Sequence, residues 1–146
     1  MNTKKIGNLT ELQCATYLYE LGCSISFPFG NSDKYDLIID YKSKLYKIQC
    51  EHANEMVDED NNVVGISVKT TWQSHNSCGW ESNKYKADEV DYFATYYKGV
   101  CYLIPINESS NIKYLRLITP KNNQEKRISY LKDFEAKVIL ESNVTN

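Results

Sequence analysis

Three features that would narrow the function at once are missing from this sequence: a strong charge imbalance, a long apolar run and a cysteine cluster. The 146 residues carry a formal net charge of −2, which gives no overall basic signal for nucleic acid, although a local basic patch can still bind it. No apolar run approaches the roughly 20 residues that cross a membrane as a helix, so we expect no membrane segment. A chain of this length has room for one hydrophobic core, which predicts a single domain over residues 1–146.

The five cysteines show no paired spacing. None stands in a Cys-x-x-Cys arrangement, and His52 and His75 do not complete a cluster, so we expect no structural zinc site. Cys14, Cys50 and Cys101 lie within apolar segments and are predicted to be buried thiols. An odd number of cysteines without a signal peptide indicates a reducing, cytoplasmic environment.

The residue periodicity predicts an α/β (α+β) fold. A first helix is expected over residues 3–21, because apolar residues recur at helical spacing. Leu9, Leu12, Thr16 and Tyr19 are predicted to form one apolar stripe, which Ala15, Leu18 and Leu21 widen. Strands are expected over 23–29, 35–41, 44–53, 63–71, 100–106 and 113–119, loops over 54–62 and 72–86, and further helices over 87–99 and 125–140. This order predicts a mixed central sheet flanked by helices.

Oxygen-bearing side chains stand where two adjacent predicted strands would meet. Asp36 opens one strand, and Gln49 and Glu51 lie two residues apart near the end of the next, so they share one face with Lys47. Glu11 of the first helix is positioned to lean over the same strand end. Carboxylate and amide oxygens suit a hard cation such as Mg²⁺. The alternative is that these residues are solvated strand ends, as isolated acids commonly are.

Four blocks of the sequence, taken in order, resemble a known superfamily. They read "GNLTELQCATYLYELGCSISFPFGNSDKYDLIID", "YKIQC", "EVDYFATYYKGVCYLIPI" and "LRLITPKNNQEKRISYLKDFE". The chain resembles the PD-(D/E)XK nuclease superfamily, in the branch of intron-encoded homing endonucleases that is similar to archaeal Holliday-junction resolvases. The resemblance implies a restriction-endonuclease-like core and a cytoplasmic protein encoded by a bacterium or a phage.

The resemblance also implies roles for particular residues. Glu11 would help to hold a metal ion, Mg²⁺ or Mn²⁺, and Asp36 would bind it directly. Gln49 matches the residue that replaces the second motif acid in this branch, and the peptide carbonyl of Cys50 would be a further ligand. The implied activity is metal-dependent hydrolysis of phosphodiester bonds in double-stranded or branched DNA by a homodimer or homotetramer.

Position 51 departs from the family pattern. The motif here is Gln-x-Lys, whereas this chain has Glu51, which cannot donate the cationic hydrogen bond that stabilises charge on the phosphate. Three interpretations stay open. Glu51 is an inactivating substitution, either natural or introduced; Glu51 binds metal while Lys47 or Lys69 replaces the lysine; or the fold is kept for DNA binding or protein interaction alone. A processing enzyme for RNA on the same fold is a further alternative.

Basic and aromatic residues mark the expected DNA contacts. The segment 69–86 is the first candidate, because loops often carry function. Its candidate residues are Lys69, Trp72, Trp80, Lys84, Tyr85 and Lys86; the alternative is a loop fixed in place by its two tryptophans. Basic residues nearer the C-terminus could contact phosphates, which position a protein without reading sequence. These are Arg116, Lys121, Lys126 and Arg127.

Overall fold

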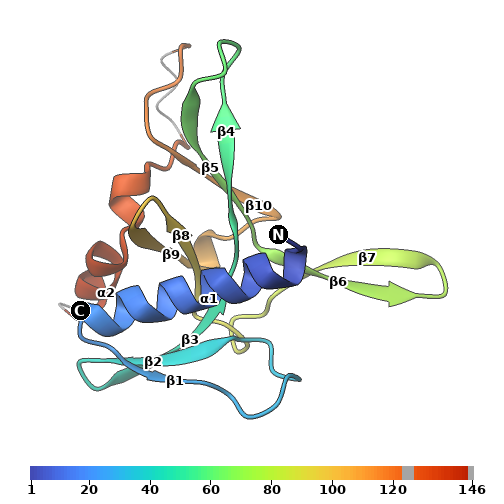
Figure 1. The fold of residues 1–146 in the computed structure, drawn as a ribbon, viewed down its shortest axis with the longest axis vertical. Coiled ribbons are helices and arrows are strands. Elements are labelled where there is room, and N and C mark those ends of the chain that lie inside the picture. The colour runs from blue at the N-terminus through green and yellow to red at the C-terminus, as the bar shows by residue number, and fades with distance from the viewer. Residues whose placement is uncertain (123–126, 145–146) are drawn as a thin grey trace.

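A computed structural model describes residues 1–122 and 127–144, and its largest element is a mixed five-stranded sheet (Figure 1). The strand order is β1-β2-β3-β8-β9. The strands are β1 Ser24–Ser26, β2 Leu37–Tyr41, β3 Lys44–Cys50, β8 Tyr92–Tyr97 and β9 Val100–Pro105. Neighbouring strands are antiparallel except for β3 and β8, which run parallel. The prediction of a mixed central sheet is confirmed.

Helix α1 (Thr3–Glu20) packs on one face of this sheet, but not through the predicted stripe. The residues that face the sheet are Thr10, Cys14, Ala15 and Leu18. They contact a layer of strand residues that includes Leu37, Ile39 and Ile48. The predicted stripe of Leu9, Leu12, Thr16 and Tyr19 is exposed instead. The prediction was right for Ala15 and Leu18, which lie in the core, and Leu21 packs against them. It was wrong for the other four residues because the helix is apolar on two sides, and the side with the smaller residues lies against the sheet.

A second sheet of three antiparallel strands has the order β10-β5-β4. Its strands are β4 Ala53–Val57, β5 Val63–Lys69 and β10 Ile112–Arg116. The segment 54–62 was predicted to be a loop, and that prediction was wrong for its first half, which is paired with β5. Asn54 and Glu55 are exposed on β4, so the strand lacks the apolar alternation by which a strand is detected.

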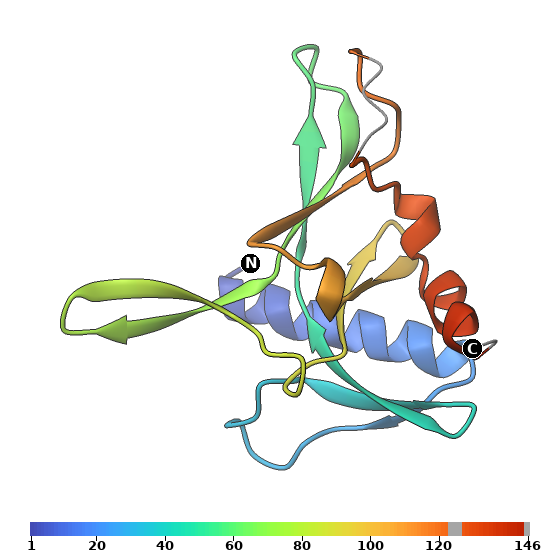
Figure 2. The same ribbon diagram turned by 180° about the vertical axis from the view of Figure 1, so that it is seen from behind.

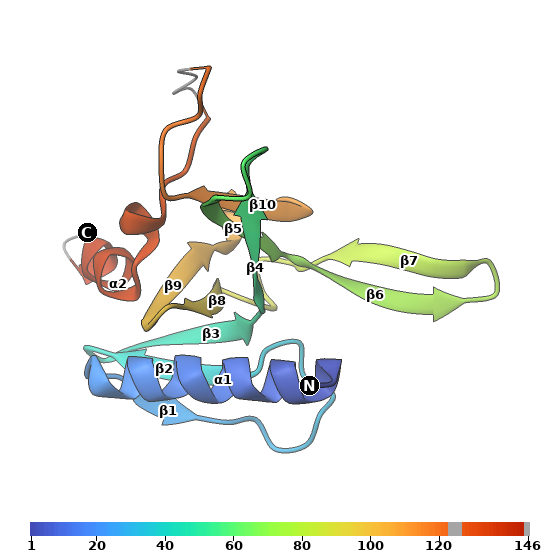
Figure 3. The same cartoon turned by 45° about the horizontal axis from the view of Figure 1, so that its top comes forward.

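Strands β6 (Thr71–Asn76) and β7 (Gly79–Lys84) form a two-stranded arm that projects from the body (Figure 3). The prediction of a loop over 72–86 was therefore wrong. The arm is polar along most of its length and buries little apolar surface, so hydrophobic periodicity gave no strand signal.

The segment 87–99 was predicted to be a helix, but its second half is β8, an interior strand of the five-stranded sheet. Acidic residues at its start and Gly99 at its end imitate helix caps. Gly99 in fact has φ +86 in the turn between β8 and β9, where positive φ suits glycine. Tyr, Phe and Thr dominate β8, and these residues favour strands.

The C-terminal segment contains less helix than predicted. Part of the expected helix over 125–140 lies outside the described residues. The described part contains a short 3-10 helix, η2 (Leu131–Phe134), followed by α2 (Ala136–Val144). Another short 3-10 helix, η1 (Ile106–Glu108), follows β9. Seen from behind (Figure 2), η2 and α2 lie beside β8 and β9, and α1 lies on the far side of the sheet. No helix among the described residues is long and apolar enough to span a membrane.

Candidate active site

Asp36 lies at the junction of β2 and β3, where it joins the two strands. Its backbone N–H donates to the carbonyl oxygen of Ile48 at 2.8 Å, and its Oδ2 accepts from the backbone N–H of Cys50 at 2.8 Å. Burial raises the pKa of Asp36, and the bond from Cys50 partly offsets this rise. The carboxylate is therefore held in place at the end of β3.

Gln49 and Glu51 point to the same side of β3, as their spacing predicts. The Nε2 of Gln49 lies 3.3 Å from Oε1 of Glu51 and donates to it, and the backbone N–H of Glu51 donates to the carbonyl oxygen of Ala94 at 2.8 Å. Burial raises the pKa of Glu51 to about 7; Asp36 raises it further, while Gln49 and Lys69 act in the opposite direction. Glu51 is thus a half-buried acid that titrates near neutral pH.

Glu11 approaches the same group from α1. Its pKa is raised first by burial, then by the negative charge of Asp36 and by Cys14. The electrostatic effect of Asp36 on both Glu11 and Glu51 means that the three carboxyl groups lie within one local field. The structure therefore brings together the helix acid and the strand acids that the sequence analysis singled out.

The donor chemistry of this acid cluster, Glu11, Asp36 and Glu51 with Gln49, fits a hard divalent cation. All its ligating atoms are oxygens, and the charge of Asp36 raises the pKa of both Glu11 and Glu51, a condition that a bound cation relieves. In the described part of the chain, no three Asp, Glu, His or Cys side chains are placed to hold an ion together. Coordination of a cation would therefore need the amide oxygen of Gln49, the peptide carbonyl of Cys50 or a change of rotamer in one of the acids.

The side chain of Cys50 faces away from the acid cluster, toward α1. Its thiol shares a hydrogen bond with Cys14, which together with burial raises its pKa well above the ordinary value. Cys14 and Cys101 are fully buried in the core on that side of the sheet. Cys50 is accordingly a neutral core thiol, and only its backbone faces the candidate site.

A family model described as PD-(D/E)XK endonuclease matches residues 1–137. The chain belongs to this family. PD-(D/E)XK nucleases generally depend on a divalent metal ion. The family resemblance inferred from the four sequence blocks is thus confirmed.

Among solved structures, this PD-(D/E)XK chain is similar to the bacterial homing endonuclease I-Ssp6803I. The two share 16% sequence identity with a TM-score of 0.76, over 100% of this chain and 98% of that chain. At this identity the likeness establishes the fold, which is the restriction-endonuclease-like fold predicted from the sequence. A search of curated proteins gave no match.

The two candidate replacement lysines of this family member differ in their surroundings. Lys69, at the end of β5, is close enough to Glu51 to lower its pKa. Lys47 instead donates from Nζ to the carbonyl oxygen of Asp88 at 2.8 Å. The backbone N–H of Lys47 also donates to Oδ2 of Asp91 at 2.8 Å, a contact that the sequence analysis missed because 87–99 was taken for a helix. Of the two lysines, Lys69 faces the acid cluster.

Tyr85 and Trp72 are partly buried rather than fully available to DNA. The ring of Tyr85 packs edge-on against Phe93, with centroids 5.3 Å apart. Burial, followed by the charges of Glu51 and Asp36, raises the pKa of Tyr85 above its ordinary value, so its hydroxyl is a neutral donor beside the acid cluster. Trp72 lies beneath the ammonium group of Lys34, 3.2 Å from its ring centroid, and fastens the arm to the body.

The exposed face of the arm carries residues that the sequence analysis largely missed. Cross-strand pairs place His75 opposite Trp80 and Gln73 opposite Ser82, and all four are exposed or nearly so. The rings of His75 and Trp80 meet edge to face, 4.9 Å between centroids. On the opposite face, Nδ2 of Asn83 donates to Oγ of Ser74 at 2.9 Å. Lys84 and Lys86 are exposed near the base of the arm.

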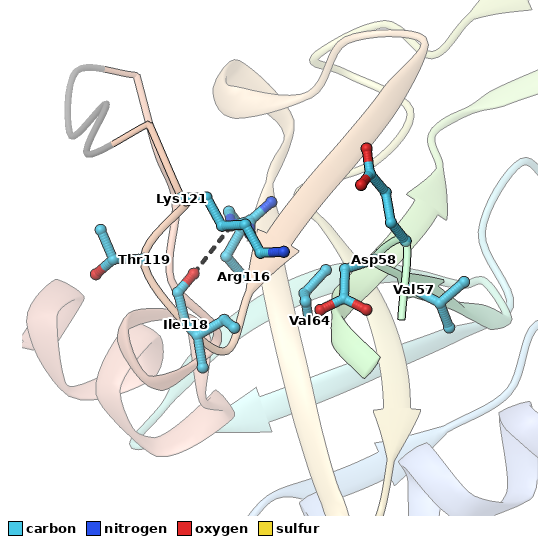
Figure 4. A pocket seen from close by; sticks show the side chains of 8 residues that line it. Val57, Asp58, Val64, Arg116, Ile118, Thr119 and Lys121 are labelled. Atoms are coloured by element: carbon cyan, nitrogen blue, oxygen red, sulfur yellow. Dashed lines mark hydrogen bonds between the residues drawn. The ribbon is translucent and has the colours of Figure 1, made fainter. Parts of the chain in front are cut away.

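The C-terminal basic residues lie on a separate part of the molecule. Figure 4 shows Arg116 and Lys121 at a shallow pocket of about 510 Å³ whose other wall carries Asp58. Nε of Arg116 donates to the carbonyl oxygen of Ile118 at 2.9 Å, and Lys121 pairs with Asp60 at 3.8 Å. Acidic neighbours thus reduce the positive charge at this surface. Arg127 is exposed, and Lys126 lies outside the described residues.

Proposed function

We propose that the chain is a metal-dependent DNA endonuclease of homing or resolvase type whose cleavage is weakened or abolished by Glu51. The proposal is supported by one observation above all. Asp36 acts electrostatically on both the helix acid Glu11 and the strand-end acid Glu51 in a PD-(D/E)XK chain, and Glu51 stands where the motif has lysine. The substrate would be double-stranded or branched DNA, and a symmetric dimer or tetramer would suit a duplex whose backbones are related by two-fold symmetry.

In this proposal Asp36 and Glu11 hold Mg²⁺ or Mn²⁺, and Gln49 and the peptide carbonyl of Cys50 complete the protein ligands. The bound ion would polarise the scissile phosphate and lower the pKa of a water. Asp36 is oriented for this role by the N–H of Cys50. Gln49 is oriented by Glu51, since its Nε2 donates to that carboxylate, and its amide oxygen would be the atom offered to a cation.

Glu51 changes the charge at the position where the lysine would act. Near neutral pH its carboxyl group exchanges between the protonated and the ionised form, because its pKa is about 7. The ionised form repels a phosphodiester, and neither form provides a cationic donor. Lys69 is the nearer replacement, and the neutral hydroxyl of Tyr85 is a second donor on the same side.

The arm and its base would contact the DNA. A two-stranded β-ribbon fits the major groove, where Gln and Ser side chains can bond base edges and aromatic rings can pack. The exposed face formed by Gln73, His75, Trp80 and Ser82 has this composition. Lys69, Lys84 and Lys86 would neutralise phosphates near the site, with Trp72 and Tyr85 supporting them.

The test is a gain of function. Supercoiled and branched DNA are incubated with Mg²⁺ or Mn²⁺ and either the unsubstituted chain or Glu51→Lys. Restoring the cationic donor should raise the cleavage rate by at least ~100-fold. Glu59→Lys, the same charge change in an exposed turn, serves as the matched control and should leave cleavage unchanged. If Glu51→Lys cleaves no DNA substrate, the nuclease mechanism is wrong.

The second candidate function is a non-catalytic DNA-binding or protein-interaction module. The substitution at position 51 favours it, because a binding module has no need of the lysine. The same assay separates the alternatives. Cleavage by the natural chain that is lost in Lys69→Ala indicates a replacement lysine, and cleavage only by Glu51→Lys indicates inactivation. DNA binding without cleavage by either protein indicates the module.

A further inference from the structure

Helix α1 carries an apolar stripe that no described element covers. Leu9, Leu12 and Tyr19 are 43%, 61% and 69% exposed, and Thr16 between them is also exposed. These residues follow the spacing 9-12-16-19, the alternating three and four residues of a coiled-coil seam. Figure 1 shows α1 as the outermost element on the near face, in front of the five-stranded sheet. The stripe lies on roughly the opposite side of the helix from Cys14 and Leu18, which face the core.

The charges of α1 are placed against its own dipole. Its first turn contains no acid and its last turn contains no basic residue. Lys4 and Lys5 stand at the N-terminal end and Glu20 at the C-terminal end, whereas an isolated helix is stabilised by the reverse arrangement. Among the described residues, neither Lys5 nor Glu20 has an ion-pair partner. The helix therefore offers a cation at one end of its apolar stripe and an anion at the other.

We propose that α1 packs antiparallel against α1 of a second copy of this chain. Reversing the helix about the middle of the stripe sets Leu9 opposite Tyr19 of the second copy and Leu12 opposite its Thr16, so every pair across the seam includes a leucine. The same reversal brings Lys5 within reach of Glu20 of the other copy, twice by symmetry. The two helix dipoles are then antiparallel, which is the favourable arrangement.

A second copy fits this surface better than an unrelated partner because the stripe is complementary to itself. A two-fold interface uses the same patch on both subunits, so apolar residues must face apolar residues and each charge must face its opposite. A parallel pair of helices would set Lys5 against Lys5 and Glu20 against Glu20. The pattern of charges therefore selects the antiparallel arrangement.

Sedimentation of the full chain over a concentration series, without DNA or metal, tests the interface independently of the proposed function. The natural chain should dimerise. Leu12→Arg should raise the dissociation constant of the dimer by at least ~30-fold, the effect of a central seam residue. Leu45→Arg, a change at a residue that is 67% exposed on β3, is the matched control and should leave the dimer intact. Circular dichroism and the melting temperature are measured for both variants to check that they fold.

A charge exchange tests the direction of the pairing. Lys5→Glu or Glu20→Lys alone should weaken the dimer several-fold at low salt, and the two together in one chain should restore it, since opposite charges again meet. The proposal is overturned if the natural chain stays monomeric at the highest concentration, if Leu12→Arg leaves the dimer unchanged, or if the paired exchange fails to restore association.

Discussion

The acid cluster at the end of β3 and the arm of β6 and β7 are both polar, but they differ in how far their side chains are exposed to solvent. The acid cluster places carboxyl groups where they are partly buried, so their pKa values rise, and hydrogen bonds hold Asp36 and Glu51 in place. The outer face of the arm places the polar and aromatic side chains of Gln73, His75, Trp80 and Ser82 where they are exposed. Carboxyl groups with raised pKa values are typical of catalytic or cation-binding sites. An exposed face of polar and aromatic side chains is typical of a surface that binds DNA.

The two regions are joined through few residues. Trp72 at the base of the arm is held by Lys34, and Tyr85 just after β7 lies beside Glu51 and Asp36. The rest of the arm rests on pairing between its own two strands. We therefore expect changes in the arm to alter DNA binding without altering stability, and changes in the acid cluster to alter both cation binding and stability.

Shortening the arm should have the largest effect. Replacing residues 73–82 by a two-residue Asn-Gly turn removes the exposed face and should weaken DNA binding by at least ~100-fold, because base contacts and stacking each contribute about 1–3 kcal/mol. The melting temperature should stay within about 2 °C, since the arm buries little apolar surface. Fluorescence anisotropy measures the affinity, and an unchanged affinity would show that the arm is not a recognition element.

Trp80, the exposed aromatic residue of the arm, should account for part of this loss of DNA affinity. Trp80→Ala should weaken DNA binding by about tenfold, the loss expected for one stacking contact. Tyr114→Ala is the matched control, because Tyr114 is an exposed aromatic on β10, away from the arm. Equal losses for the two variants would mean that exposed aromatic residues bind DNA without a defined site.

Glu51→Gln should stabilise the protein in a pH-dependent way. The pKa of Glu51 is about 7 in the folded chain against an ordinary 4.5, so below pH 4.5 both states are protonated and the acid has no net effect. As the pH rises from 4.5 to 7 the unfolded chain releases the proton first, and the free energy of unfolding falls.

Glutamine does not titrate, so at pH 8 the variant should melt about 5 °C higher than the natural chain, the shift that roughly 1–2 kcal/mol gives in a domain of this size. At pH 4.5 the two should melt together. Glu59→Gln, at an exposed turn position, is the control. A constant difference at all pH values would show that Glu51 is not the titrating group.

The smallest expected effect is a change in the pKa of Glu51, which should differ between variants of Lys69 and Lys47. Lys69→Ala should raise the pKa of Glu51, because the positive charge of Lys69 lowers it. Lys47→Ala should leave that pKa unchanged, because its ammonium group is bound to the carbonyl oxygen of Asp88. NMR titration of the labelled glutamate carboxyl group measures both. Equal shifts in the two variants would remove the distinction between the lysines.

The parts of the fold that the sequence predicted well depend on short-range signals. The spacing of Gln49 and Glu51 on a strand, and the position of Asp36 at the start of its neighbour, follow from the two-residue period of a strand. The hairpin of β2 and β3 needed only a short turn. These local rules placed the strand acids correctly before any tertiary contact was known.

The errors arose where tertiary contacts decide the structure. In α1 both faces are apolar, and which face meets the sheet depends on the fit of Cys14 and Ala15 against it. In β8 cap-like residues at both ends outweighed the strand-forming residues between them. The arm is stabilised by backbone pairing between β6 and β7. The pattern of apolar residues in the sequence does not reveal this pairing.

Direct titration of Mn²⁺ into the protein, followed by electron paramagnetic resonance, tests the central claim that the acid cluster binds a divalent cation. The natural chain should bind one ion, and Asp36→Asn should abolish that binding, while Asp60→Asn at an exposed turn should not. Absence of binding by the natural chain, or equal binding by Asp36→Asn, would contradict the claim.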